Sequence, residues 1–223
     1  DGNVDNLLDS NNLWTPTTDS GTHLVFGDQF NPNDAYEGEQ IIGATYFSAE
    51  FNLSEKFKTV LGIRTEFFNS YYTGQNNTTI FDSEKILDPF DFFPSANLIY
   101  SLTDNSNLRS SYSRTTARPS FKEASVAQIF DPITNRLFIG NINLAPTYVN
   151  NFDLRYERYG ESGQMFAMSG FYKDFKDPIE QAFFLQAPTQ LTVDNLGSAK
   201  VYGVELEIRQ RLGFITEGLD NLK

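Results

Sequence analysis

The residues that could perform catalysis or bind a metal form no recognised catalytic or metal-binding pattern in this sequence. His23 is the only histidine, so a Ser-His-Asp triad would have to use it, and no strained Gly-x-Ser-x-Gly turn is present to carry the serine. Three aspartates in predicted loops, Asp88, Asp91 and Asp131, could contact Ca²⁺, but they lack the spacing of an EF-hand loop. Cysteines and glycine-rich phosphate loops are absent. We therefore expect no enzyme, no cofactor and no metal site.

A second group of charged residues alternates with apolar ones, and this pattern is informative. Side chains two positions apart in a strand point to the same face of a sheet. The alternation therefore predicts ladders of charge on one face, which must be wet or ion-paired. We interpret that face as the wall of a watery lumen and the charges as cross-strand ion pairs. The predicted lumen-lining set is Arg64, Glu66, Arg109, Asp153, Arg155, Glu157, Glu205, Glu207 and Arg209.

The strands that must carry these charges are predicted at seven places: 41–53, 57–72, 92–102, a segment starting at 107, one ending at 159, 165–175 and 200–212. Long connections, expected as loops at 73–90, 117–146 and 177–197, alternate with short turns. Residues 1–37 are expected to form a loop on the long-loop side, with the end of a preceding strand. Short turns on one side and long loops on the other are typical of an up-and-down membrane barrel. Seven strands cannot close such a barrel, because an open sheet leaves two unpaired edges in lipid, so we expect a piece of a larger one.

Composition narrows the possible partners. The net charge of -12 argues against nucleic acid, whose phosphates require a basic surface. Mean hydropathy is -0.39, and no run approaches the ~20 apolar residues of a membrane helix. A barrel remains possible, since its lumen face and loops are polar. Aromatic residues make up 15% of the chain, which fits either a β-rich core or aromatic girdles at two lipid interfaces.

Five sequence runs in order carry a family resemblance: SRTTARPSF, GNINLAP, NNFDLRYE, SGFYKDFKDPIE and NLGSAKVYGVELEIRQRL. Together with GATYFSAEFNLSEKFKTVLGIRTEFF upstream, they resemble the barrel of TonB-dependent outer-membrane receptors over about residues 36–223. The resemblance implies an all-β fold: an antiparallel up-and-down transmembrane β-barrel, present here as about seven or eight strands. It also implies outer-membrane lipid around the barrel of a Gram-negative bacterium. The expected domain is one barrel region over 1–223, without the plug domain.

The same resemblance implies active uptake of a scarce nutrient, such as a ferric siderophore, a corrinoid or a glycan. An inner-membrane TonB complex would supply energy through the plug, and the ladders of charge would hold the plug or, alternatively, line the substrate path. Long extracellular loops would capture the ligand. Candidate ligand-binding residues in the longest loop are Arg118, Phe121, Phe130, Arg136 and Phe138; at least the phenylalanines are better explained as packing the loop on itself. The alternative function is a soluble or surface-attached β-sandwich that binds carbohydrate.

Overall fold

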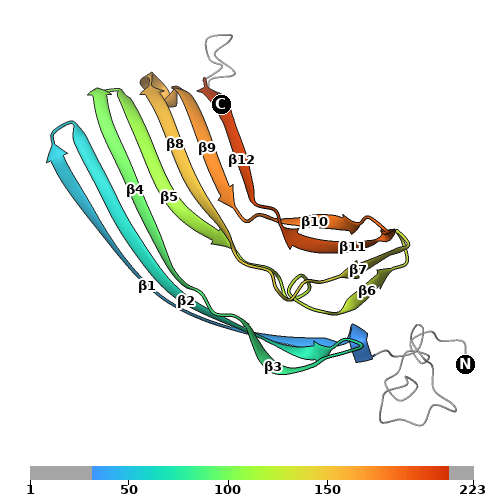
Figure 1. Cartoon of the computed structure of the whole chain (residues 1–223). Helices are drawn as coiled ribbons and strands as arrows, with labels where there is room; N and C mark the ends of the chain where they lie inside the picture. The colour runs from blue at the N-terminus through green and yellow to red at the C-terminus, as the bar shows by residue number, and fades with distance from the viewer. Residues whose placement is uncertain (1–31, 211–223) are drawn as a thin grey trace, which may run out of the picture.

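A computed structural model describes residues 32–210, and about three quarters of them lie in strands, most of which pair antiparallel (Figure 1). Seven long strands follow one another across a large curved sheet in the order β1-β2-β4-β5-β8-β9-β12. Their bounds are β1 Tyr36–Ser54, β2 Phe57–Gln75, β4 Phe90–Thr103, β5 Ser106–Ala117, β8 Thr147–Tyr159, β9 Met165–Lys176 and β12 Ser198–Arg209. This meander confirms the seven predicted strands and the fold class, a partial up-and-down barrel.

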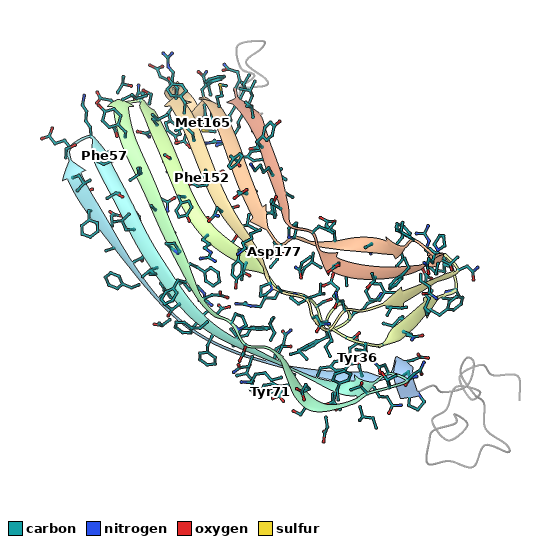
Figure 2. The ribbon with its side chains drawn as sticks, in the orientation of Figure 1. Tyr36, Phe57, Tyr71, Phe152, Met165 and Asp177 are labelled. Atoms are coloured by element: carbon teal, nitrogen blue, oxygen red, sulfur yellow. The ribbon has the colours of Figure 1, made fainter. Side chains whose placement is uncertain are left out.

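Short turns join the long strands at one end of the sheet. Between β4 and β5 the hydroxyls of Thr103 and Ser106 lie 2.7 Å apart, and the Asn105 amide donates to the Thr103 hydroxyl at 3.3 Å. Between β8 and β9 a 3-10 turn, Glu161–Gly163, reverses the chain. Figure 2 shows Phe57 and Met165, which begin β2 and β9, near this end. We call it the turn end and the opposite end the loop end.

The long connections at the loop end contain strands, which corrects the expectation of irregular loops. β3 (Ile80–Leu87) folds back on β2, while β6 (Gln128–Asp131), β7 (Arg136–Ile139), β10 (Ile179–Phe184) and β11 (Ala187–Asn195) build a second, small sheet. This small sheet has the order β10-β11-β7-β6 and projects from the loop end (Figure 1). Its central pairing, β11 with β7, is parallel and joins two different connections. Strands of four residues are too short to show a periodic signal.

A hydrogen-bonded junction connects the large sheet to the small one. Asp177, between β9 and β10, adopts φ 53°, and its amide donates to the carbonyl of Gly197, which has φ 32°. The Asn195 side chain donates to the carbonyls of Asp177 at 2.8 Å and Ala145 at 3.0 Å. The Thr147 hydroxyl donates to the same Asp177 carbonyl at 2.9 Å. The loop after β5 and the loop after β9 are therefore fixed to each other where they leave the wall.

A cluster of buried hydrophobic residues lies at the small sheet. It consists of Phe138, Leu144 and Val193, with Ile129, Ile179 and Leu191 packed against it. The large sheet leaves one face of apolar side chains exposed, so the alternative of a two-sheet sandwich is wrong. Across residues 32–210, no helix is long and apolar enough to span a membrane. His23 and residues 1–31 of the loop expected at 1–37 lie outside the described residues, as does the predicted end of the last strand at 212.

Candidate functional site

The strand register brings all nine predicted lumen residues to one face of the large sheet. Residues directly opposite each other in an antiparallel pair share a face. Arg109 lies opposite Arg155, Arg155 opposite Ser169, and Ser169 opposite Glu205. Across β2 and β4, Glu66 lies opposite Asp91 in the same way. We call this the polar face. Its placement on the lumen side of a barrel stays a prediction.

Glu157 is the centre of an ion-pair network on the polar face. Its buried carboxylate accepts from Arg109 Nε at 2.7 Å, Arg155 Nε at 2.8 Å and the Tyr159 hydroxyl at 2.9 Å. Arg155 also donates to Glu207 at 2.7 Å, which carries the network to β12. Arg109 and Arg155 are direct cross-strand neighbours, and like charges in that position repel. Glu157 therefore stabilises two cations that would otherwise destabilise the wall.

Arg118 is the centre of a second network, near the loop end. Its Nη2 lies 2.5 Å from Glu66 Oε1 and 3.6 Å from Asp91, and its guanidinium lies 4.4 Å from the centre of the Phe68 ring. Arg64 pairs with the other oxygen of Glu66 at 2.5 Å. Arg118 belongs to the connection after β5, whereas Glu66 and Asp91 belong to β2 and β4. Arg118 thus attaches the longest connection to the wall through two carboxylates, while Arg64 pairs with Glu66 within β2.

The second network lies near the place where the pairing between β4 and β5 ends. Pairing between β4 and β5 ends at Ser95 and Ser113, whereas β2 and β4 remain paired as far as Phe90. Beyond Ser95 and Ser113, β4 and β5 separate towards the loop end (Figure 1). Tyr148 of β8 spans the opening, since its hydroxyl donates to Asp91 at 2.6 Å. Sequence reasoning missed Tyr148, and it treated Asp91 as a loop carboxylate although it lies in β4.

The five predicted ligand-binding residues do not converge on one pocket. Phe138 is buried in the hydrophobic cluster, and Arg118 is held by its carboxylates. Phe121 packs over Gly38 of β1, where no larger residue would leave room for the ring. Phe130 is exposed on β6, and Arg136 lies 5.5 Å from the centre of the Phe183 ring on β10. Phe183 was not predicted.

Asp131 is held in a tight turn between β6 and β7. The Thr134 hydroxyl donates to its carboxylate at 2.6 Å and the Ile133 amide donates at 3.0 Å. These two hydrogen bonds, the hydroxyl first, hold the pKa of Asp131 below its usual range. Asp88 is 3.9 Å from Lys85. Within 32–210, no three potential metal ligands of the His, Cys, Asp and Glu types cluster together.

The opposite face of the large sheet is apolar and exposed; we call it the apolar face. Aromatic side chains mark both ends of it, including Phe92 and Tyr100 on β4 and Phe166 and Tyr172 on β9. Tyr100 is eight positions along the strand from Phe92, which corresponds to about 26 Å. That length is close to the apolar band of ~25 Å between two aromatic girdles in membrane barrels, before strand tilt is considered.

Comparison with known proteins agrees with this geometry. The chain matches a family model described as TonB dependent receptor-like, beta-barrel, over residues 2–221. A mutant of the ferric enterobactin receptor PfeA from Pseudomonas aeruginosa is similar in fold, with a TM-score of 0.54, 18% identity and coverage of 78% of this chain and 25% of that one. The Serratia marcescens hemophore receptor HasR, solved with its hemophore HasA and heme, gives a TM-score of 0.62 at 10% identity, covering 77% and 32%.

A third similar structure is the alcaligin outer membrane receptor FauA of Bordetella pertussis, with a TM-score of 0.51, 16% identity and coverage of 79% and 28%. This chain therefore spans no more than about a third of these three solved chains. A search of curated proteins gives no significant match. The family model covers nearly the whole sequence, and the sheet is an open part of the same kind of barrel. The chain belongs to the family of TonB-dependent receptor-like β-barrels.

Proposed function

We propose that this chain forms part of the barrel of an outer-membrane receptor in a Gram-negative bacterium, which takes up a scarce nutrient by TonB-dependent transport. The observation that carries the proposal is the two-faced sheet, with exposed apolar side chains on one face and ion-pair networks on the other. Lipid would cover the apolar face. The polar face would line the lumen and contact a plug domain, through which an inner-membrane TonB complex would act.

The apolar face supports the lipid contact. Leu154, Val204, Leu206 and Ile208 are all more than half exposed on it. Burying such side chains in hydrocarbon is favourable, whereas in water they would form a contiguous exposed apolar surface, which marks an interaction or membrane-contact site. The small sheet would then stand on the extracellular side, because long connections of membrane barrels lie there and short turns face the periplasm.

The small sheet is the proposed place of ligand capture. Phe130, Arg136 and Phe183 expose aromatic and cationic groups at its far end. Such groups suit an anionic chelate or a sugar, because rings stack on planar groups and guanidinium binds carboxylates and phosphates. Two of the similar structures are a ferric enterobactin receptor and an alcaligin outer membrane receptor, which favours a ferric siderophore over a corrinoid or a glycan. For Arg118 and Phe138 we propose a structural role, since both are occupied by protein contacts.

Replacing the tip of the β6–β7 hairpin tests the proposal. In the complete receptor, residues 130–136 would be replaced by a short Gly-Ser linker, which removes Phe130 and Arg136 but leaves Arg118 and Phe138 in their structural contacts. We expect normal assembly and weaker uptake. Uptake would be measured by growth with ferric catecholates, ferric hydroxamates or heme as the sole source of iron, or with a corrinoid as the sole source of that nutrient. A matched control replaces the turn residues Asp104 and Asn105 with Gly, at the turn end. Unchanged uptake of the nutrient that the wild type uses would contradict ligand capture by this hairpin.

A further inference from the structure

The large sheet splits into two halves at the loop end. β4 stays paired with β2 as far as Phe90, and β5 stays paired with β8 as far as Ala117. Between β4 and β5, however, the last pair is Ser95 with Ser113. The next residue of β4 towards the loop end is Pro94, which has no amide hydrogen to donate to a ladder. We call β1 to β4 the first half, and β5, β8, β9, β12 and the small sheet the second half.

The segment 118–127 crosses from the second half to the first and back, and we call it the strap. It begins after Ala117, the last residue of β5, and ends before Gln128, the first residue of β6. The strap is folded on itself, because the Ser120 amide and hydroxyl donate to the Glu123 carboxylate at 2.8 and 2.9 Å. We therefore expect it to dock on the wall, or to leave it, as one unit.

The strap lies on the polar face of the first half. The Phe121 ring packs over Gly38 of β1. The Val126 amide donates to the Tyr72 hydroxyl of β2 at 3.3 Å. Gly38 lies opposite Tyr72, which has the same strand parity as Glu66 and therefore shares its face. The strap thus covers the part of the polar face that would line the mouth of the lumen.

The charged contact that joins the two halves is incompletely hydrogen-bonded. Arg118 Nη2 lies within ion-pair distance of Glu66 and Asp91. The Tyr148 hydroxyl of the second half donates to Asp91 at 2.6 Å. Among the buried side-chain atoms of residues 32–210, Asp91 Oδ2 and Arg118 Nε and Nη2 have no partner with hydrogen-bond geometry. Buried charges without such bonds lose much of their mutual attraction to desolvation, so this contact closes the split only weakly.

We propose that the strap is a releasable closure of the barrel mouth. Docked, it holds the two halves of the split wall together. Released, it lets the halves part at the loop end and uncovers the polar face beneath it, while the ladder from Ser95 and Ser113 to the turn end keeps the wall intact. The inference rests on the proposed function for the position of this face at the outer mouth of a lumen.

The test is the distance between the two halves, measured by double electron–electron resonance on the complete receptor in lipid. Spin labels would replace the exposed Glu84 on β3 and Glu180 on β10. We expect one narrow distribution with the strap intact. Arg118→Gln should add a population that is longer by one strand spacing, ~5 Å, and Tyr148→Phe should add less of it. Labels at Glu55 and Glu84, both in the first half, should keep one distance in every variant.

A matched control removes an ion pair that does not cross the split. Arg64→Gln takes a guanidinium from the other oxygen of Glu66 within β2 and should leave the distance unchanged. If Arg118→Gln fails to assemble, Phe121→Ala takes its place, because it removes the ring over Gly38 without leaving a charge unpaired. Heat-modifiable migration on gels confirms that each variant is folded.

Uncovering of the polar face has a readout of its own. Ser70 is 3% exposed and lines a small space beneath Phe121 and Ala124 of the strap. With Ser70→Cys, a water-soluble maleimide should react roughly tenfold faster in the Arg118→Gln background, because opening of the cover limits the reaction. The rate should not change in the Arg64→Gln background.

Identical distance distributions for Arg118→Gln and Arg64→Gln, or identical reactivity of Ser70→Cys in these two backgrounds, would overturn the proposal. Both readouts are made without nutrient. A receptor whose halves part on release of the strap, but which takes up no ferric chelate, would contradict the proposed nutrient and leave the strap intact. A receptor that transports normally while its halves never part would contradict the strap alone.

Discussion

Arginine substitutions along β12 should report depth in the membrane. Lys200, Tyr202, Val204, Leu206 and Ile208 follow one another on its apolar face. Tyr202 is two positions from Lys200, near the loop end of β12, so it should lie at the lipid interface. Leu206 lies four residues further, about 13 Å along the strand and roughly 10 Å in depth for a strand tilted by ~40°. Since the apolar band is about 25 Å thick, Leu206 should lie close to the midplane.

This geometry predicts different penalties at two sites that are similarly exposed, 77% for Tyr202 and 67% for Leu206. Leu206→Arg brings a cation to the middle of the hydrocarbon and should cost about 2–4 kcal/mol of folding free energy, whereas Tyr202→Arg should cost about 0–1 kcal/mol. The matched control is Glu205→Gln on the polar face, which should cost less than about 1 kcal/mol because the site is wet.

The assay is reversible unfolding of the complete barrel in phospholipid vesicles, with guanidinium as denaturant. Equal and large penalties at positions 202 and 206 would refute the different membrane depths assigned to Tyr202 and Leu206. A protein core would penalise a buried arginine equally at either position. Equal and negligible penalties would refute the lipid contact itself.

Three further predictions concern the polar networks and the loop end. Glu157→Gln leaves Arg109 and Arg155 as opposed cations and should cost about 1–3 kcal/mol in the same assay; Asp153→Asn, which loses only a 3.2 Å bond from Ser111, is its control and should cost much less. Arg118→Gln should release residues 118–127 from the wall, which hydrogen exchange of that segment would detect as faster exchange, while Arg64→Gln should leave the segment protected; equal protection in both variants would contradict the role of Arg118. The hydrogen bonds that lower the pKa of Asp131 stabilise its turn at every pH above the ordinary pKa of 3.8. This stabilisation is lost as the pH falls through the lowered pKa. Exchange of residues 128–139, corrected for intrinsic rates, should therefore accelerate below about pH 4 in the wild type but not in Asp131→Asn; the same pH response in both would be the contrary result.

The sequence predicts the wall well because each strand carries its own signal. Alternation around Phe152, Leu154 and Tyr156 fixes which side chains share a face, and the family resemblance supplies the order of the strands. All nine charged residues assigned to one face lie there. The alternation does not show which charged side chains pair. Arg109 and Glu157 are 48 residues apart in sequence, and only the register between β5 and β8 brings them together.

The loop end could not be predicted in the same way. Its main contacts join segments without periodicity: Arg118 reaches Glu66 and Asp91, and Leu137 pairs with Gln190 in parallel. Phe138 was expected to contact ligand or to pack the loop on itself. Its burial with Leu144 and Val193 depends on the small sheet, whose strands come from two different connections.

The two faces of the large sheet can be tested directly on β8. Spin labels at Asn151, Phe152, Asp153 and Leu154 in the receptor reconstituted in lipid, with and without its plug, would be probed by oxygen, which concentrates in hydrocarbon, and by a water-soluble nickel chelate. The two-faced wall predicts strong oxygen contact at 152 and 154. It predicts weak oxygen contact at 151 and 153, with nickel reaching those two positions once the plug is removed. Uniform oxygen contact at all four positions, or the opposite alternation, would contradict the assignment of a lipid face and a lumen face.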